Sequence, residues 1–223
     1  MKRTSARLVA VLCAAALWAP ARAQAEAPST VNADEALKLL LAGNQRFVAG
    51  NLNSVTRDEM AQRRAELVHG QKPLAIVLCC SDSRVGPEIV FDQELGNIFV
   101  VRTAGEVLDA AGIGSIEYAV AHLGSSLLLV LGHEHCGAVA DAKEPGHIAS
   151  IVKAIRPAVI RTKGQPGDTM QNAIRANVQD IAARLRSTGP VLSAKVKTGQ
   201  LKVMGATFAL GTGKVDLVPD ELK

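Results

Sequence analysis

The chain has 223 residues, of which 48% are hydrophobic and 21% are charged, a composition typical of a globular domain and not of a disordered or fibrous protein. Its formal net charge is +4, but Lys2, Arg3, Arg7 and Arg22 lie close to the N-terminus, so the rest of the chain is nearly neutral. This balance gives no reason to expect binding to nucleic acid or to an anionic membrane surface.

Residues 1–25 have the features of a secretory signal peptide. Basic residues precede an apolar stretch from Leu8 to Trp18, and small residues follow at the expected cleavage positions. The apolar stretch is too short to span a bilayer, so we expect no stable membrane insertion after cleavage. A buried N-terminal helix is the alternative. We therefore expect a periplasmic protein in which residues 26–223, a length that suits one domain, fold as a single unit.

Helix and strand signals alternate along this domain. Asn32 and Thr56 each precede a glutamate by three residues, a spacing typical of helix N-caps, and the two helices end near Gly50 and Gly70. Because these helices come before any strand, we expect them to pack on a partner subunit. Apolar runs then predict strands at 74–80, 98–101, 126–132, 201–210 and 214–218. Helices are expected at 87–91, 112–123, 136–160 with a break near Pro145, 168–187 and 190–199.

This alternation predicts an α/β fold, with a mostly parallel sheet covered by helices on both faces. The last two strands flank Gly211-Thr212-Gly213, so the chain should end in a hairpin whose final strand is antiparallel at one edge.

The cysteines favour a metal site over a disulfide framework. Cys13 lies in the predicted signal peptide, which leaves Cys79, Cys80 and Cys136, an odd number for an exported protein. A disulfide from Cys136 to Cys79 or Cys80 is the structural alternative, but it leaves the nearby His133 unexplained.

Two clusters of polar side chains follow predicted strands. Cys79 to Arg84 come after one apolar run, and Gly132 to Gly137 come after another. Because the carboxyl ends of parallel strands meet at one edge of a sheet, the clusters should lie together. Cys80, His133 and Cys136 then offer two thiolates and an imidazole. Zinc binds such ligands, and three of them with one open position mark a catalytic site.

Asp82 and Arg84 favour a catalytic role for such a site. Asp82 can accept a hydrogen bond from a zinc-bound hydroxide, and Arg84 would keep that carboxylate ionised. Two alternatives stay open: Asp82 fills the fourth zinc position in a resting form, or the pair only stiffens a turn. Strand alternation points Cys79 away from Cys80, so we expect Cys79 to be a core thiol. We expect His135 to face solvent or to support the site without binding the metal.

Together these motifs resemble the β-class carbonic anhydrases. The resemblance rests on Cys80-Ser81-Asp82-Ser83-Arg84 and on Gly132-His133-x-x-Cys136-Gly137, and it continues through Phe99-Val100-Val101-Arg102 to residues 205–215. It implies one zinc ion per subunit, bound by Cys80, His133 and Cys136, with Asp82 and Arg84 as a catalytic dyad. It also matches Gln71 to a glutamine that lines the substrate pocket from the partner chain, and Phe99 to an apolar wall of that pocket.

The fold implied by this resemblance is a four-stranded, mostly parallel sheet with an antiparallel edge strand, in a homodimer or homotetramer. The implied activity is the zinc-dependent, reversible hydration of carbon dioxide to bicarbonate and a proton by attack of a zinc-bound hydroxide. Two other functions fit the same scaffold: hydrolysis of carbonyl sulfide or carbon disulfide, and a non-catalytic zinc- or bicarbonate-sensing protein. The presence of Asp82 and Arg84 argues against the second.

Overall fold

The computed structural model describes residues 31–53, 56–140 and 146–220. The predicted signal peptide lies outside these residues. Within them, no helix has the length and apolar character needed to cross a membrane.

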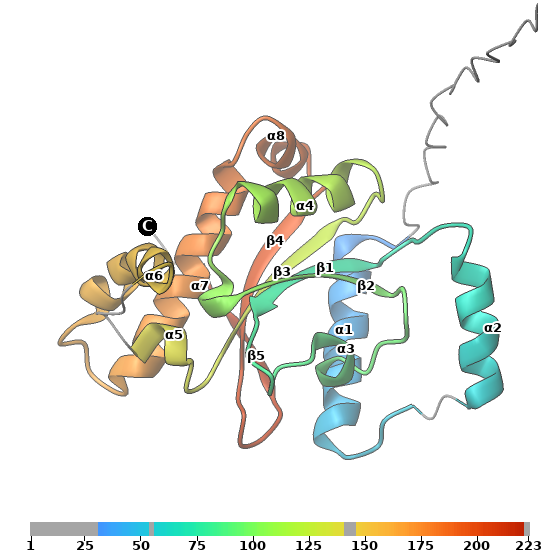
Figure 1. The fold of residues 1–223 in the computed structure, drawn as a ribbon, viewed down its shortest axis with the longest axis horizontal. Coiled ribbons are helices and arrows are strands. Elements are labelled where there is room, and N and C mark those ends of the chain that lie inside the picture. The colour runs from blue at the N-terminus through green and yellow to red at the C-terminus, as the bar shows by residue number, and fades with distance from the viewer. Residues whose placement is uncertain (1–30, 54–55, 141–145, 221–223) are drawn as a thin grey trace, which may run out of the picture.

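The chain alternates between helices and strands in the order predicted (Figure 1). The strands are β1 (Ala75–Cys80), β2 (Ile98–Thr103), β3 (Leu127–His133), β4 (Lys202–Phe208) and β5 (Val215–Val218). The helices are α1 (Ala33–Val48), α2 (Arg57–Leu67), α3 (Pro87–Val90), α4 (Ala110–Ala121), α5 (Gly137–Ala140), α6 (Ile148–Thr162), α7 (Thr169–Ser187) and α8 (Val191–Lys197), with a 3-10 turn, η1, at Ala104–Glu106.

The strands form one sheet in the order β2-β1-β3-β4-β5. β2, β1, β3 and β4 are parallel, and β5 pairs antiparallel with β4. The sheet therefore has five strands and not four, because the edge strand adds to four parallel ones. The order reverses at β1, since the chain moves outward to β2 and then returns to β3 on the other side of β1. Ligand sites in parallel sheets lie at such a switch point, beyond the carboxyl ends of the strands.

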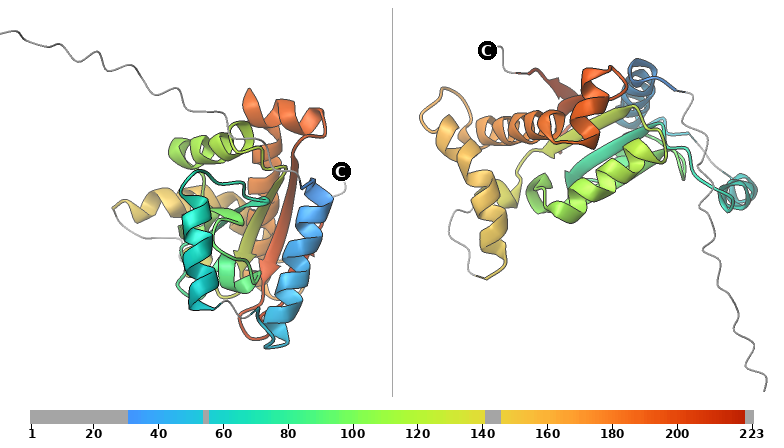
Figure 2. Two further views of the ribbon diagram at one scale, coloured as in Figure 1. Left: turned by 90° about the vertical axis from the view of Figure 1, so that its right-hand side faces the viewer. Right: turned by 90° about the horizontal axis from the view of Figure 1, so that it is seen from above.

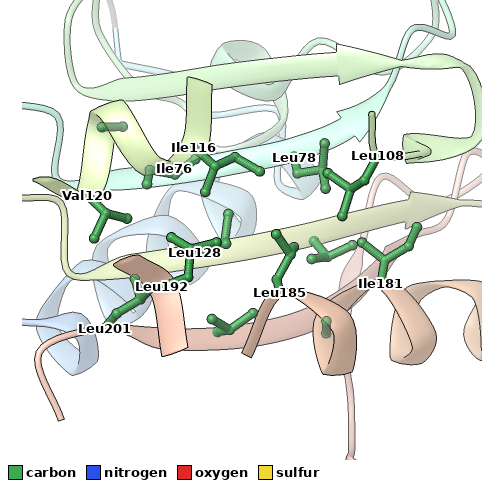
Figure 3. Packing of buried hydrophobic residues seen from close by; sticks show 14 of the residues in the cluster. Ile76, Leu78, Leu108, Ile116, Val120, Leu128, Ile181, Leu185, Leu192 and Leu201 are labelled. Carbon is green, nitrogen blue, oxygen red and sulfur yellow. The ribbon is translucent and has the colours of Figure 1, made fainter. Parts of the chain in front are cut away.

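Helices cover both faces of the sheet, as predicted (Figure 2). On one face, Ile76 and Leu128 pack against Ile116 of α4 and Leu185 of α7 (Figure 3). On the other face, the alternate strand residues pack against α1 and α3. The central strands β1 and β3 are buried along their whole length, which explains why they read as unbroken apolar runs.

The two N-terminal helices differ in how they pack. α1 places Ala36 and Leu40 in the core of its own sheet, so its apolar face is covered within the chain. α2 has no buried residue and stands apart from the sheet (Figure 1), tied to the loop before β2 by hydrogen bonds from Arg63 to Leu95 O and Asn97 Oδ1, both 3.1 Å. Packing on a partner subunit stays a prediction.

Two glycines let α7 approach the sheet closely. A Cβ at Gly132 of β3 or at Gly205 of β4 would lie 2.6 Å from a methyl carbon of Val178, which is too close for any other residue. This contact brings the N-terminal half of α7 against the carboxyl end of β3, where the polar clusters lie.

Asn44 joins α1 to the end of α3 and to the turn that leads into β5. Its Nδ2 donates to Val90 O at 3.1 Å and to Gly213 O at 2.8 Å, and its Oδ1 accepts from Val215 N–H at 2.9 Å. We expect Asn44→Ala to lower the free energy of unfolding by about 3 kcal/mol, because it leaves buried backbone groups without partners. Urea unfolding tests this, with the exposed Asn51→Ala as control. Equal stability of the two variants would contradict it.

Candidate metal centre

Three metal-binding side chains meet at the carboxyl edge of the sheet. Cys80 ends β1, His133 ends the neighbouring β3, and Cys136 precedes α5. One ligand atom from each lies within 4.8 Å of the others. The two Sγ atoms are 4.0 Å apart, and all three cysteines of the described residues are free, so the disulfide alternative is not what this structure contains.

The imidazole of His133 is oriented as a metal ligand. Its Nδ1 lies 2.8 Å from Glu134 O, and because a carbonyl oxygen can only accept, Nδ1 carries the hydrogen and Nε2 keeps a lone pair. Nε2 is buried and has no hydrogen-bond partner among the described residues. A buried polar atom without a partner is unfavourable. A zinc ion held with the two sulfurs would satisfy it, so these residues fit zinc.

The hydrogen bond between Cys80 and Cys136 favours ionisation of one of the two thiols. The hydrogen bond between the two thiols lowers the pKa of Cys80 well below its usual range despite burial, with smaller contributions from His133 and Gly105. The Gly105 N–H lies 3.2 Å from Cys80 Sγ. The same hydrogen bond raises the pKa of Cys136. Thiolates are the metal-binding form of cysteine, so one ligand is ionised before any metal arrives.

Asp82 lies beside the ligands and is held by Arg84. Its Oδ2 is 3.7 Å from His133 Nε2. The Arg84 backbone N–H and Nε both donate to Oδ1 at 2.9 Å, and Nη2 donates to Oδ2 at 2.7 Å. These hydrogen bonds keep the pKa of Asp82 well below its usual range, so the carboxylate is an ionised acceptor near neutral pH.

Glu106 is a feature that the sequence did not reveal. It is 1% exposed, it has a left-handed φ of 46°, and its Oε2 has no hydrogen-bond partner among the described residues. Asn177 of α7 lies 3.5 Å from Oε1 and donates to Gly105 O at 3.0 Å. Burial, with a smaller contribution from the Cys80 thiolate, raises the pKa of Glu106 to about 8. A single glutamate after a strand gives no periodic signal of burial.

This raised pKa predicts a pH-dependent stability difference. Folded Glu106 stays protonated up to about pH 8, whereas the unfolded side chain ionises near 4.5, so the free energy of unfolding falls as the pH rises between these values. Glu106→Gln removes that loss. We expect metal-depleted E106Q to gain stability over the wild type across this window, by a few kcal/mol at its upper end. Urea unfolding at several pH values measures the difference, and parallel pH profiles would contradict it.

The remaining predicted residues lie elsewhere in the chain. Gln71 is exposed and precedes β1, at the end of the strand opposite Cys80. Phe99 pairs with Ile76 in the sheet and lies 6.5 Å from the Tyr118 ring, between ring centres. The structure of one chain does not bring either of them to the metal ligands, and their place in a substrate pocket stays a prediction.

The two neighbours of the ligands lie as expected. Cys79 is fully buried in the core on the α1 side of the sheet. His135 is exposed, with a left-handed φ of 51°. Its backbone oxygen accepts from Arg84 Nη2 at 3.3 Å, which links the two polar clusters.

Comparisons with known proteins show that the chain is similar to carbonic anhydrases. A family model described as carbonic anhydrase matches residues 75–215. "Carbonic anhydrase 2" of Mycobacterium tuberculosis (strain CDC 1551 / Oshkosh) is 39% identical over 198 residues, which cover 85% of this chain and 94% of the relative. The solved Coccomyxa β-carbonic anhydrase in complex with acetazolamide is 27% identical, with a TM-score of 0.65 over 72% of this chain and 80% of that one. A tetrameric β-carbonic anhydrase from Sordaria macrospora shares the fold at 22% identity, with a TM-score of 0.65 over 82% of this chain and 96% of that one.

Proposed function

This chain belongs to the β-class carbonic anhydrase family, and we propose that it catalyses the zinc-dependent, reversible hydration of carbon dioxide to bicarbonate and a proton. The observation that carries this proposal is the cluster of Cys80, His133 and Cys136 next to an ionised Asp82. Zinc, when bound by these three residues, supplies a Lewis acid that lowers the pKa of a water molecule enough for it to attack carbon dioxide near neutral pH.

Asp82 and Arg84 would orient the nucleophile. The Asp82 carboxylate can only accept hydrogen bonds, so a water molecule beside it must point a hydrogen toward it and a lone pair elsewhere. Arg84 fixes the carboxylate with three hydrogen bonds and thereby fixes that orientation. The proton released in each turnover passes to buffer. A resting form in which Asp82 itself binds the metal is compatible with the same geometry.

Apolar side chains of α6 and α7 would exclude water from the side of the metal ligands that they cover. Ile155 of α6 and Ile174 of α7 are buried against Cys80 and Cys136. A cleft of about 460 Å³ opens beside Arg84, and its walls are mostly apolar. It is lined by Phe47, Val48, Arg84, Phe208, Leu210, Thr212 and Gly213. Such walls suit a small nonpolar gas, and we propose this cleft as one route to the site.

We also propose that the protein is exported to the periplasm and acts as a homodimer or homotetramer. The export proposal rests on residues 1–25 of the sequence. The oligomer proposal is supported by α2, which has no buried residue in the single chain, and by the tetrameric Sordaria protein with the same fold. In such an assembly, Gln71 and Phe99 would complete the substrate pocket.

Parallel assays of two reactions test the proposed function. Stopped-flow hydration of carbon dioxide is compared with sulfide release from carbonyl sulfide and carbon disulfide on the same zinc-quantified sample. We expect fast hydration and sulfide release near the buffer rate. Sulfide release without hydration would assign the site to the hydrolase alternative, and a zinc-loaded protein inactive in both assays would indicate a sensor.

A further inference from the structure

Arg102 connects β2 to the turn that carries Cys80 and Asp82. Its Nε donates to Cys80 O at 3.0 Å, and its Nη2 donates to Asp82 O at 2.7 Å. These are the backbone carbonyls of Cys80, a proposed metal ligand, and of Asp82, whose carboxylate is proposed to orient the nucleophile. A single guanidinium therefore contacts the backbone on both sides of Ser81.

Two backbone hydrogen bonds also hold this turn, but neither of them joins Cys80 to Asp82. The Ser81 N–H donates to Thr103 O at 3.1 Å, and the Val85 N–H donates to Asp82 O at 3.0 Å. The first bond continues the pairing of β1 with β2, and the second closes the turn locally. From the neighbouring strand β2, Arg102 donates to the backbone carbonyls of both Cys80 and Asp82.

The donors of Arg102 are directed at this turn and not at an acid. Among the described residues, no carboxylate forms an ion pair with Arg102. The guanidinium presents its N–H groups in a rigid plane, so its two bonds fix the separation and direction of the two carbonyls together. A lysine keeps the charge but has no fork of fixed geometry.

We propose that Arg102 is a positioning residue that holds Asp82 in place relative to the metal ligand Cys80. This role rests on the proposed function, since it acts through Asp82 on the hydration step. Both hydrogen bonds of Arg102 go to backbone carbonyls, so its action passes through the turn. Residues that orient metal ligands from outside typically contribute 10- to 100-fold in affinity or activity.

Arg102→Lys tests the proposal, with Arg175→Lys as the matched control, because Arg175 of α7 is exposed and its side chain forms no hydrogen bond or ion pair with the residues that the structure describes. We expect R102K to lower kcat by about tenfold and zinc affinity by about tenfold. R175K should change neither. Zinc affinity is measured by competition with a chromogenic chelator, which needs no turnover. If R102K matches R175K in both measurements, the proposal is wrong.

A double-mutant cycle separates positioning from general stability. If Arg102 acts through Asp82, then adding R102K to the Asp82→Asn variant should change its residual kcat by less than about twofold. An equal loss of kcat with and without the Asp82 carboxylate would show a purely structural role and overturn the proposal.

The two hypotheses fail in distinguishable ways. If the wild-type protein does not hydrate carbon dioxide, the proposed function fails, and with it the action of Arg102 through Asp82. The zinc affinity of R102K still reports in that case whether Arg102 holds Cys80. If the wild type is active and R102K behaves like R175K, only the role of Arg102 is rejected.

Discussion

Cys80→Ser is expected to remove both bound zinc and carbon dioxide hydration. Cys80 is the ligand that β1 contributes, and its hydrogen bond with Cys136 lowers the pKa of its thiol. A serine hydroxyl does not ionise near neutral pH and is a poor zinc ligand, so two ligands remain where three are needed. We expect zinc content near zero and a hydration rate within about a factor of two of buffer, because the Lewis acid is lost.

The adjacent cysteine provides the control for this experiment. Cys79 is fully buried on the opposite face of β1, and burial raises the pKa of its thiol to about 12. Cys79→Ala should retain one zinc per chain and its turnover, at a cost of about 1 kcal/mol in stability. Elemental analysis and stopped-flow assays on both variants decide the matter. Zinc at wild-type level in C80S, or its loss in folded C79A, would refute the ligand assignment.

Asp82→Asn is expected to keep zinc but lose most turnover. The variant preserves the size of the side chain and all three metal ligands, so zinc content should stay at one per chain. An amide can turn its NH₂ group toward the nucleophile, and it does not hold the fixed acceptor that Arg84 maintains at Asp82. We expect kcat to fall by roughly 100-fold, which is typical of losing one positioned acid–base group.

An exposed Asp–Arg pair elsewhere controls for the loss of an ion pair. Asp180 of α7 forms a salt bridge with Arg161 far along the chain, and Asp180→Asn should leave kcat unchanged. Turnover and zinc content are measured together for D82N, D180N and the wild type across pH. Full activity in D82N would contradict the role of Asp82. Higher activity than the wild type at low pH would instead support the resting form in which Asp82 binds the metal.

Much of the metal centre could be predicted because its residues follow buried strands. Cys80 and His133 each end a continuous apolar run, and parallel strands place such ends together. The helix caps at Asn32 and Thr56 could also be predicted from the sequence, because a cap is a local interaction. The apolar runs predicted five strands, whereas the four-stranded sheet implied by the resemblance was wrong, because β5 adds an antiparallel strand to the four parallel ones.

Other features depend on contacts between distant segments. The amphipathic pattern of α1 predicts that its apolar face is covered, but it does not say whether the same chain or a partner covers it. In the structure, the sheet of the same chain covers this face. The burial of Glu106 follows from the close approach of α7, which Gly132 and Gly205 permit. The bonds from Arg102 to the Cys80–Asp82 turn arise only once β2 pairs with β1. No periodicity in the sequence encodes these contacts.

The most direct test of the central hypothesis is a zinc titration of the metal-depleted protein, followed by stopped-flow hydration of carbon dioxide. If Cys80, His133 and Cys136 form the catalytic zinc centre, the hydration rate should rise in proportion to bound zinc and reach a plateau at one zinc per chain. A protein that binds this zinc stoichiometrically and still hydrates carbon dioxide no faster than buffer would contradict it.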